Sequence, residues 1–389
     1  MQNILFKFTP SFLIQIFLFL FVNTLFILKY VSRIEEEGVN ALIILFIYIL
    51  LFLSFLYLYI AKIKWMEEFY KIAFWSILVF LSVVIIALLI SVDPYSVNVD
   101  RWSAVTFFLD GLFSGNYPYA VHTHMSETNF PSPFPVWYII NFPFYCLGDV
   151  GIGLIFFLWL TAFCVRYFFN SYEKSFLFLF FLFISPAYWW EIVVRSDSLS
   201  NALLVFCFIL WFSKKEYALS DKLGLTILIC GLLLTTRLSA ILPVALFLFK
   251  PWLKLSWKQK IIFPLAIITT VFLAFSPFIF WDTNTWIFFY RNPFISETSA
   301  GSPYVLILMI IIGCFWAYRW QGITQFFDST AIFTFLFMLV SQINLIMTKD
   351  INGSIFTDLV YDISYFSLLL PYCFAFLSEK LHNFRSSTC

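Results

Sequence analysis

The chain has 389 residues, of which 62% are hydrophobic and 12% are charged, with a formal net charge of +1. A soluble domain is about 45–50% apolar and about 25% charged, so this composition excludes an ordinary soluble protein and predicts an integral membrane protein. The sequence has no dense basic tract, which excludes nucleic acid as a partner. Its seven cysteines show neither metal-ligand spacing nor a disulfide framework.

The apolar runs predict membrane-spanning helices, each of which needs roughly 20 apolar residues. The first run follows Lys7, is long enough to span and lacks a small-residue cleavage site, so we expect a retained first helix and not a signal peptide. In chain order the candidate spans lie near residues 11–28, 41–61, 72–92, 150–169, 175–190, 199–213, 223–249, 261–280, 303–320, 329–347 and 355–378. We therefore predict an all-α, polytopic helical bundle of roughly 10–12 transmembrane helices, forming a single domain over residues 1–389.

Two apolar runs are irregular. The run 134–148 is short and interrupted by prolines, and it fits a re-entrant, an interfacial or a spanning segment equally well. The run 223–249 is long, has lysine clusters on both flanks and carries Arg237 in its middle. Lysine clusters mark cytoplasmic ends, so this run is predicted to be two short helices that meet near Arg237 on the far side of the membrane.

The distribution of basic residues predicts the sidedness of the loops. With the N-terminus inside and the polar loop 93–133 outside, 16 of the 23 Lys and Arg residues fall on the inner side. This placement follows the positive-inside rule. We therefore expect loop 93–133 to be a large first outer loop, and loops of this length are usually functional or disordered.

The outer loops contain the candidate catalytic carboxylates. Asp100 lies a few residues beyond the third predicted helix, in the sequence Asp-Arg-Trp, where it could deprotonate an acceptor hydroxyl. Asp93, at the helix end before Pro94, is the alternative. Asp110 precedes a glycine, which is typical of a turn.

Four arginines fall on the outer side: Arg101, Arg195, Arg237 and Arg291. Arginine binds phosphate through its planar guanidinium, so each is a candidate for substrate binding. Arg237 lies within an apolar run, where a charge is expensive unless it faces a ligand, snorkels or pairs with a carboxylate. Asp197, two residues after Arg195, is either a substrate-binding residue or, like Ser198, a helix N-cap. Arg291 belongs either to an ordinary outer loop or to a second wall of the site.

A divalent metal is considered at His122, His124 and Glu127, which lie close together in loop 93–133. These residue types are metal ligands, and the His-x-His spacing suits an extended segment. Solvated polar side chains are the alternative. No other cofactor is expected.

The order of these motifs resembles the GT-C superfamily of polytopic membrane glycosyltransferases, which use a lipid-phosphate-linked sugar as donor. The resemblance rests on Asp-Arg-Trp at Asp100, on the Gly-Asn-Tyr-Pro-Tyr turn with Tyr117 and Tyr119, and on the Pro-Ser-Pro-Phe-Pro segment before the next helix. Arg-Ser-Asp at Arg195, Thr-Arg at Arg237 and Arg-Asn-Pro-Phe at Arg291 also look like bacterial members. The resemblance implies substrate contacts for Tyr117 and Tyr119 and an acidic catalytic residue at Asp100.

The resemblance implies an inverting glycosyltransferase of the bacterial inner membrane, with its active site on the periplasmic side. Its expected partners are a polyprenyl-phosphate sugar, a lipid or glycan acceptor and membrane lipid. The chain carries no large C-terminal soluble region, which favours transfer of one sugar to such an acceptor. The alternative is a lipid-linked glycan flippase, transporter or polymerase, for which intramembrane arginines would line a path.

Overall fold

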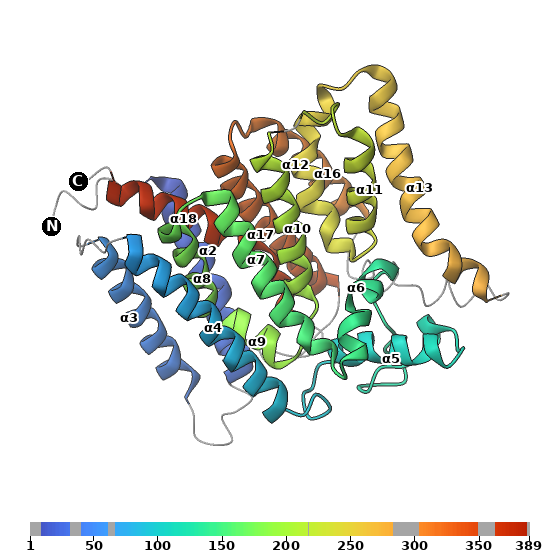
Figure 1. Ribbon diagram of the computed structural model, residues 1–389, viewed down its shortest axis with the longest axis horizontal. Helices are drawn as coiled ribbons and strands as arrows, with labels where there is room; N and C mark the ends of the chain where they lie inside the picture. The colour runs from blue at the N-terminus through green and yellow to red at the C-terminus, as the bar shows by residue number, and fades with distance from the viewer. Residues whose placement is uncertain are drawn as a thin grey trace. The chain divides into compact units, whose positions relative to one another are not determined.

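The computed structural model describes residues 9–31, 40–60, 67–216, 218–282, 303–348 and 362–386. In these ranges the chain forms 15 α-helices and no β-strand, which confirms the predicted all-α fold class. The described residues fall into two compact units, each built from more than one stretch of chain (Figure 1). The prediction of a single domain over residues 1–389 stays a prediction.

Long apolar helices make this a multi-pass membrane protein. Six described helices are long and apolar enough to cross a bilayer: Pro10–Val31, Ala41–Ile60, Glu67–Ser91, Val150–Phe169, Trp257–Trp281 and Ile323–Met347. The pair Tyr172–Phe183 and Pro186–Val193, bent by 64°, is a seventh candidate if it forms one broken span. Four further apolar helices are shorter than a span, so the predicted count of 10–12 spans stays a prediction.

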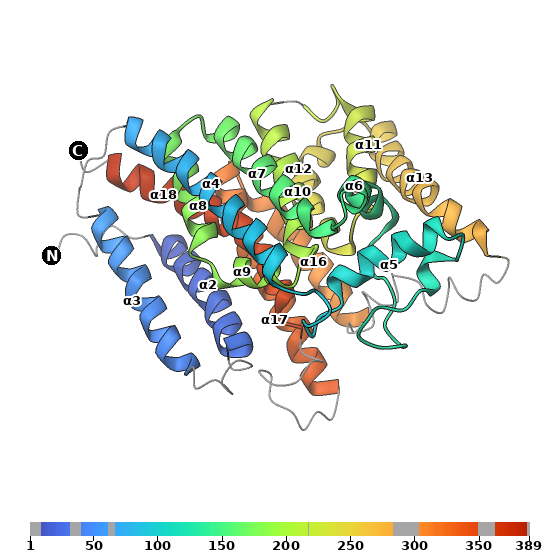
Figure 2. The ribbon, with the colours of Figure 1, turned by 60° about the horizontal axis from the view of Figure 1, so that its bottom comes forward.

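The first unit comprises Met1–Val83, Ala162–Glu191 and Trp320–Cys389. Its described helices are α2 (Pro10–Phe26), α3 (Ala41–Ile60), most of α4 (Glu67–Ser91), the end of α7 (Gly153–Phe169), α8 (Tyr172–Phe183), most of α9 (Pro186–Val193), α17 (Ile323–Thr348) and α18 (Leu370–Ser386). The C-terminal helix α18 contacts α2, α8 and α17 (Figure 2). The side chains of residues 370–377 are buried. Helix α18 is therefore the centre of this unit.

A charged cluster joins four helices of the first unit. The carboxylate of Glu173, in the first turn of α8, accepts hydrogen bonds from Tyr59 at 2.7 Å and from Arg385 at 2.6 Å. Its other oxygen lies 2.8 Å from Nδ1 of His382, and Arg385 also contacts the hydroxyl of Tyr70. The ends of α3, α4, α8 and α18 are thus held together by one carboxylate.

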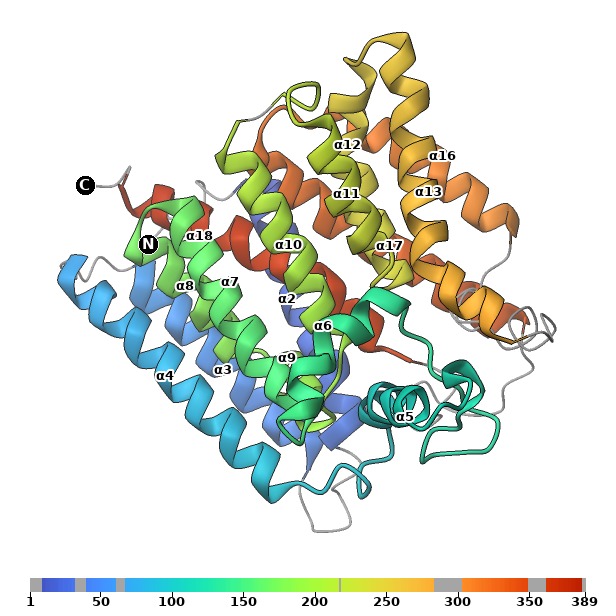
Figure 3. The ribbon, with the colours of Figure 1, turned by 45° about the vertical axis from the view of Figure 1, so that its right-hand side comes forward.

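The second unit comprises Val84–Thr161 and Ile192–Arg319. Its helices are α5 (Arg101–Phe113), α6 (Pro135–Cys146), the start of α7 (Gly153–Phe169), α10 (Ser198–Lys214), α11 (Leu223–Leu234), α12 (Ile241–Leu253), α13 (Trp257–Trp281) and α16 (Pro303–Arg319). Helix α13 lies beside α11, and α12 contacts both α10 and α16 (Figures 1 and 3). The run 134–148 forms the 12-residue helix α6, which is shorter than a bilayer-spanning helix.

The loop 93–133 is folded, and its glycines explain how. Helix α5 occupies its first half and ends in a Schellman motif, in which Asn116 N–H donates to Gly111 O at 2.9 Å and Gly115 N–H donates to Leu112 O at 3.4 Å. Gly115 has φ +76°, a conformation that side chains disfavour. A Cβ atom on Gly111 would lie 2.7 Å from Val121. Gly111 and Gly115 therefore serve the local fold.

An aromatic core supports this loop. Phe108 of α5 stacks on Tyr138 of α6 with ring centroids 3.4 Å apart, and Tyr119 packs edge-on against Phe108 at 4.9 Å. The hydroxyl of Tyr119 donates to the carbonyl of Pro133 at 3.2 Å. The two halves of the loop are thereby fixed to each other and to α6.

Candidate active site

The apolar run 223–249 is broken at Arg237. Helix α11 ends at Leu234, a 3-10 turn covers Leu238–Ala240, and α12 begins at Ile241, which confirms the prediction of two short helices. Arg237 between them has an extended backbone with φ −155° and ψ 154°. The hydroxyl and the N–H of Thr235 both donate back to the carbonyls of Gly231 and Leu232, which closes the last turn of α11.

The proline segment before α6 stabilises the same break. The N–H of Phe134 donates to Thr236 O, and the N–H of Val136 donates to Thr235 O, each at 3.0 Å. Pro135 lies between them as the first residue of α6, where a missing N–H costs no helix hydrogen bond. Non-helical backbone at membrane depth needs such partners, because lipid supplies none.

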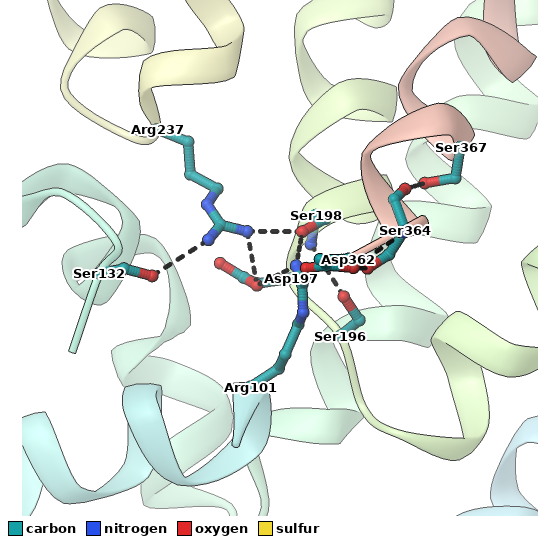
Figure 4. A network of polar contacts seen from close by, with 9 residues as sticks. All are labelled: Arg101, Ser132, Ser196, Asp197, Ser198, Arg237, Asp362, Ser364 and Ser367. Atoms are coloured by element: carbon teal, nitrogen blue, oxygen red, sulfur yellow. Dashed lines mark hydrogen bonds and ion pairs between the residues drawn. The ribbon is translucent and has the colours of Figure 1, made fainter. Parts of the chain in front are cut away.

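Two buried arginines meet at the start of α10. The guanidinium of Arg237 donates to Asp197 at 2.9 Å, to the Ser198 hydroxyl at 2.6 Å and to the Ser132 hydroxyl at 3.2 Å. Arg101, from the start of α5, contacts the same Ser198 hydroxyl and lies 4.0 Å from Asp197. Figure 4 shows Arg101 and Arg237 reaching Ser198 from opposite sides. We call Arg101, Ser132, Asp197, Ser198 and Arg237 the arginine cluster.

The arginine cluster is shielded from solvent. The side chains of Arg101, Asp197 and Arg237 are 9%, 6% and 4% exposed. The sequence left three environments open for Arg237: a ligand, snorkelling or a carboxylate partner. The structure shows the carboxylate partner, Asp197. Asp197 occupies the N-cap position of α10, but its side chain makes no capping hydrogen bond and accepts one from Arg237 instead. Asp197 therefore belongs to the cluster and is not a simple cap.

Asp100 is the chain neighbour of Arg101 and opens helix α5. Its carboxylate accepts hydrogen bonds from Thr123 at 3.4 Å and from Asn129 at 3.3 Å. Thr123 and Asn129 belong to the segment that leads on to Ser132, and Ser132 contacts Arg237. Asp100 is half-buried, so its carboxylate is held in place while part of it reaches solvent.

Asp93 lies elsewhere in the loop and is exposed. Its carboxylate accepts a hydrogen bond from the N–H of Tyr95 at 3.0 Å, and its carbonyl accepts one from Ser96 at 2.7 Å. These are contacts of a local turn at the end of α4. The geometry therefore favours Asp100 over Asp93 as the carboxylate beside the arginine cluster.

Comparison with protein-family models, with curated proteins and with solved structures gives no match.

Arg195 has a different environment from Arg101 and Arg237. It forms an ion pair with Asp149 at 2.7 Å and donates to the carbonyls of Leu89 and Val92, each at 2.8 Å. These carbonyls are at the C-terminal end of α4, which a cation stabilises. Arg195 also has φ +49°, so its backbone turns sharply before α10. The predicted substrate-binding role gains no support, and the contacts of Arg195 are structural.

The two predicted substrate-binding tyrosines also differ. Tyr119 is fully buried in the aromatic core of the loop, where packing explains its position. Tyr117 is half-buried, and burial together with the Asp282 carboxylate raises the pKa of its phenol to about 12. Tyr117 therefore stays protonated at neutral pH and is able to donate a hydrogen bond to a ligand.

The three predicted metal ligands do not form a ligand set. Nδ1 of His124 lies 2.6 Å from the Ser103 hydroxyl, and its Nε2 lies 3.3 Å from the carbonyl of Val97. The ring of His122 packs against Phe130, with centroids 4.8 Å apart, and Glu127 is exposed. Throughout the described part of the chain, no three His, Cys, Asp or Glu side chains are grouped to hold a metal. His124 instead fastens its loop to α5.

Arg291, the remaining candidate, lies outside the described residues. Sequence reasoning did not predict the contacts of Ser132 or Ser198 with Arg237. Ser198 could have been suspected from the sequence, because it follows Asp197 at the start of α10. Ser132 carried no signal beyond its position between two prolines.

Proposed function

We propose that this protein is a membrane glycosyltransferase that transfers a sugar from a polyprenyl-phosphate donor to a lipid or glycan acceptor. The observation that carries the proposal is the convergence of Arg101 and Arg237 on Ser198, beside the loop that holds Asp100. Guanidinium groups and hydroxyls are the groups that bind phosphate, and a half-buried carboxylate beside them supplies a base.

In this proposal, Arg101 and Arg237 bind the donor phosphate. Asp100 accepts the proton of the acceptor hydroxyl while that oxygen forms a bond to the anomeric carbon. The bond between the anomeric carbon and the phosphate oxygen breaks, its electron pair stays on that oxygen, and polyprenyl phosphate leaves. The arginines stabilise the charge that develops on the departing phosphate, which is where positioned cations contribute most to catalysis. Single displacement inverts the anomeric centre.

The proposal places the site on the outer face of the membrane, in a bacterium on the periplasmic side of the inner membrane. Support comes from the positive-inside distribution of Lys and Arg and from the resemblance of the Asp100, Arg195 and Arg237 motifs to GT-C enzymes. The donor reaches the site from the membrane, since its prenyl chain stays in lipid. Because His122, His124 and Glu127 do not form a ligand set, no step of the proposed reaction uses a metal.

The test is transfer of radiolabelled sugar from a panel of polyprenyl-phosphate sugars by the purified protein in nanodiscs, with and without EDTA. We expect release of polyprenyl phosphate that depends on donor and acceptor, and a large loss of turnover in Arg237→Gln. Arg319→Gln, which changes an exposed arginine at the end of α16, is the matched control and should turn over normally. Movement of glycan lipid across reconstituted vesicles, with no turnover of any donor, would instead support a flippase or transporter.

A further inference from the structure

Helix α10 presents two buried acceptor oxygens without hydrogen-bond donors. Oδ2 of Asp197 and Oδ1 of Asn201 are both buried and have no partner among the described residues. The side chain of Asp197 is 6% exposed, and Asn201 is 1% exposed. Buried polar atoms are almost always paired, so two such oxygens on one helix need an explanation.

The hydrogen bonds around Asn201 fix which of its amide atoms is unpaired. Its Nδ2 donates to the hydroxyl oxygen of Thr236 at 2.7 Å. The hydroxyl of Thr236 donates to the carbonyl of Leu233 and accepts from the Asn201 amide. The amide nitrogen therefore faces Thr236, and the amide oxygen is the atom left without a donor.

The two oxygens lie on the same side of α10 as the arginine cluster. Asp197 and Asn201 are four residues apart, so their side chains lie one above the other on a single helix face. Oδ1 of Asp197 accepts from Arg237, whereas Oδ2 has no donor among the described residues. Asn201 contacts Thr236, the residue before Arg237. The acceptor oxygens thus extend the cluster along α10 by one helical turn.

We propose that Asp197 Oδ2 and Asn201 Oδ1 form a subsite that accepts hydrogen bonds from hydroxyl groups of the donor sugar. The subsite would recognise the sugar while Arg101 and Arg237 bind the phosphate, so this inference rests on the proposed function. A neutral hydrogen-bond donor suits this subsite better than a cation, because the negative charge of Asp197 is already paired with Arg237. A sugar hydroxyl supplies such a donor, and a site built to bind a hydroxyl discriminates strongly against analogues that lack it.

The test compares binding of two probes to the protein in detergent: polyprenyl phosphate and polyprenyl-phosphate hexose. Asn201→Leu removes one acceptor, and Asp197→Asn places an amide N–H where an acceptor is needed while its oxygen still accepts from Arg237. We expect each variant to weaken binding of the sugar probe by roughly 10- to 100-fold. Asn201→Leu, which lies outside the arginine cluster, should leave polyprenyl phosphate bound as well as before. Thr330→Val, which removes another buried hydroxyl without a partner, should change neither affinity.

Single-deoxy analogues of the hexose keep the proposal testable even if a variant folds poorly. In the natural protein, removing the recognised hydroxyl should weaken binding by roughly 10- to 100-fold, and Asn201→Leu should be insensitive to the same removal. Equal binding of every deoxy analogue by the natural protein would overturn the subsite. If polyprenyl phosphate itself failed to bind, and Arg237→Gln behaved as the natural protein, the proposed function would fall first.

Discussion

The guanidinium of Arg237 and the carboxylate of Asp197 lie 2.9 Å apart, and both side chains are more than nine-tenths buried. Arg237 stands at the break between two short helices, and Asp197 stands at the start of a third. The pair therefore joins two interruptions of regular structure in the second unit. Burial makes this contact costly to break, since a lone charge would remain in a site of low polarity.

Removing one partner of this pair should destabilise the protein. Arg237→Gln leaves the buried carboxylate of Asp197 with only the more distant Arg101, and we expect the free energy of unfolding to fall by roughly 3 to 5 kcal/mol. The double variant Arg237→Met, Asp197→Leu should regain part of that loss, because it removes both members of the close pair and leaves only the charge of Arg101, yet it should not bind polyprenyl phosphate. Thermal unfolding in detergent micelles measures the first effect and lipid binding the second. A double variant as unstable as the single one would contradict this account.

Asp100→Asn should separate catalysis from stability. The amide keeps an oxygen that accepts from Thr123 or Asn129, so the melting temperature should stay nearly unchanged. Loss of a general base should lower the transfer rate by roughly 10²- to 10⁴-fold. Asp93→Asn is the matched control, since it changes an exposed carboxylate in the same loop and should transfer sugar at the natural rate. Equal loss in both variants would remove Asp100 from its proposed role.

Arg195→Gln should behave differently from Arg237→Gln in the transfer assay. The substitution leaves the carbonyls of Leu89 and Val92 and the carboxylate of Asp149 without their guanidinium. We expect a loss of roughly 2 to 3 kcal/mol in unfolding free energy, as for a broken charged hydrogen-bond set. The KM for donor, measured on folded protein, should stay the same. A strongly raised KM would place Arg195 at the substrate after all.

Gly115→Ala should destabilise the loop after α5. A residue with a Cβ atom at φ +76° costs roughly 1 to 2 kcal/mol, although no atom lies within 4 Å of the added carbon. Gly224→Ala is its matched control, because it also enters open space but sits in helix α11. Alanine favours a helix over glycine, so this variant should unfold at the same or a higher temperature. Identical shifts in the two variants would show that the φ angle does not matter.

Glu173→Gln should loosen the first unit. The amide cannot compensate Arg385 or accept both hydrogen bonds as strongly as the carboxylate does, so we expect a loss of about 3 kcal/mol in unfolding free energy. Glu68→Gln, at an exposed carboxylate 3.6 Å from Lys71, should have an effect below about 1 kcal/mol. Urea unfolding of both variants in the same detergent gives the comparison. A negligible effect of Glu173→Gln would mean that packing alone joins these helices.

Local sequence signals were sufficient for most of the long apolar helices and for the break at Arg237, but not for α5, which lies within the predicted loop 93–133, nor for the start of α18 at Leu370. Long apolar runs predict helices because lipid forces the backbone to bond within itself. The flanking lysines and the central arginine located the break, since both ends of the run had to lie on one side of the membrane. The sequence predicts the run 175–190 as one span, whereas the structure divides it into the bent pair Tyr172–Phe183 and Pro186–Val193.

The roles of individual arginines could not be predicted. Arg195 and Arg237 both border apolar runs, and no local pattern tells them apart. What distinguishes them is contact across the chain: Arg195 reaches carbonyls more than 100 residues earlier, whereas Arg237 reaches Asp197 and Ser132. The sequence could have placed Asn201 on the same helix face as Asp197, because it lies one helical turn later. Whether its side chain is buried depends on tertiary packing.

The hydrogen bonds of Phe134 and Val136 to Thr236 and Thr235 decide what could be moved to another protein. A graft of residues 223–249 alone would strand two backbone carbonyls in lipid, and the two short helices would tend to merge into one, turning Arg237 away from its place. The smallest portable piece must also carry the proline segment from nearly a hundred residues earlier. The position of Arg237 therefore depends on two segments, the broken run 223–249 and the proline segment before α6, and a change to either one would move it.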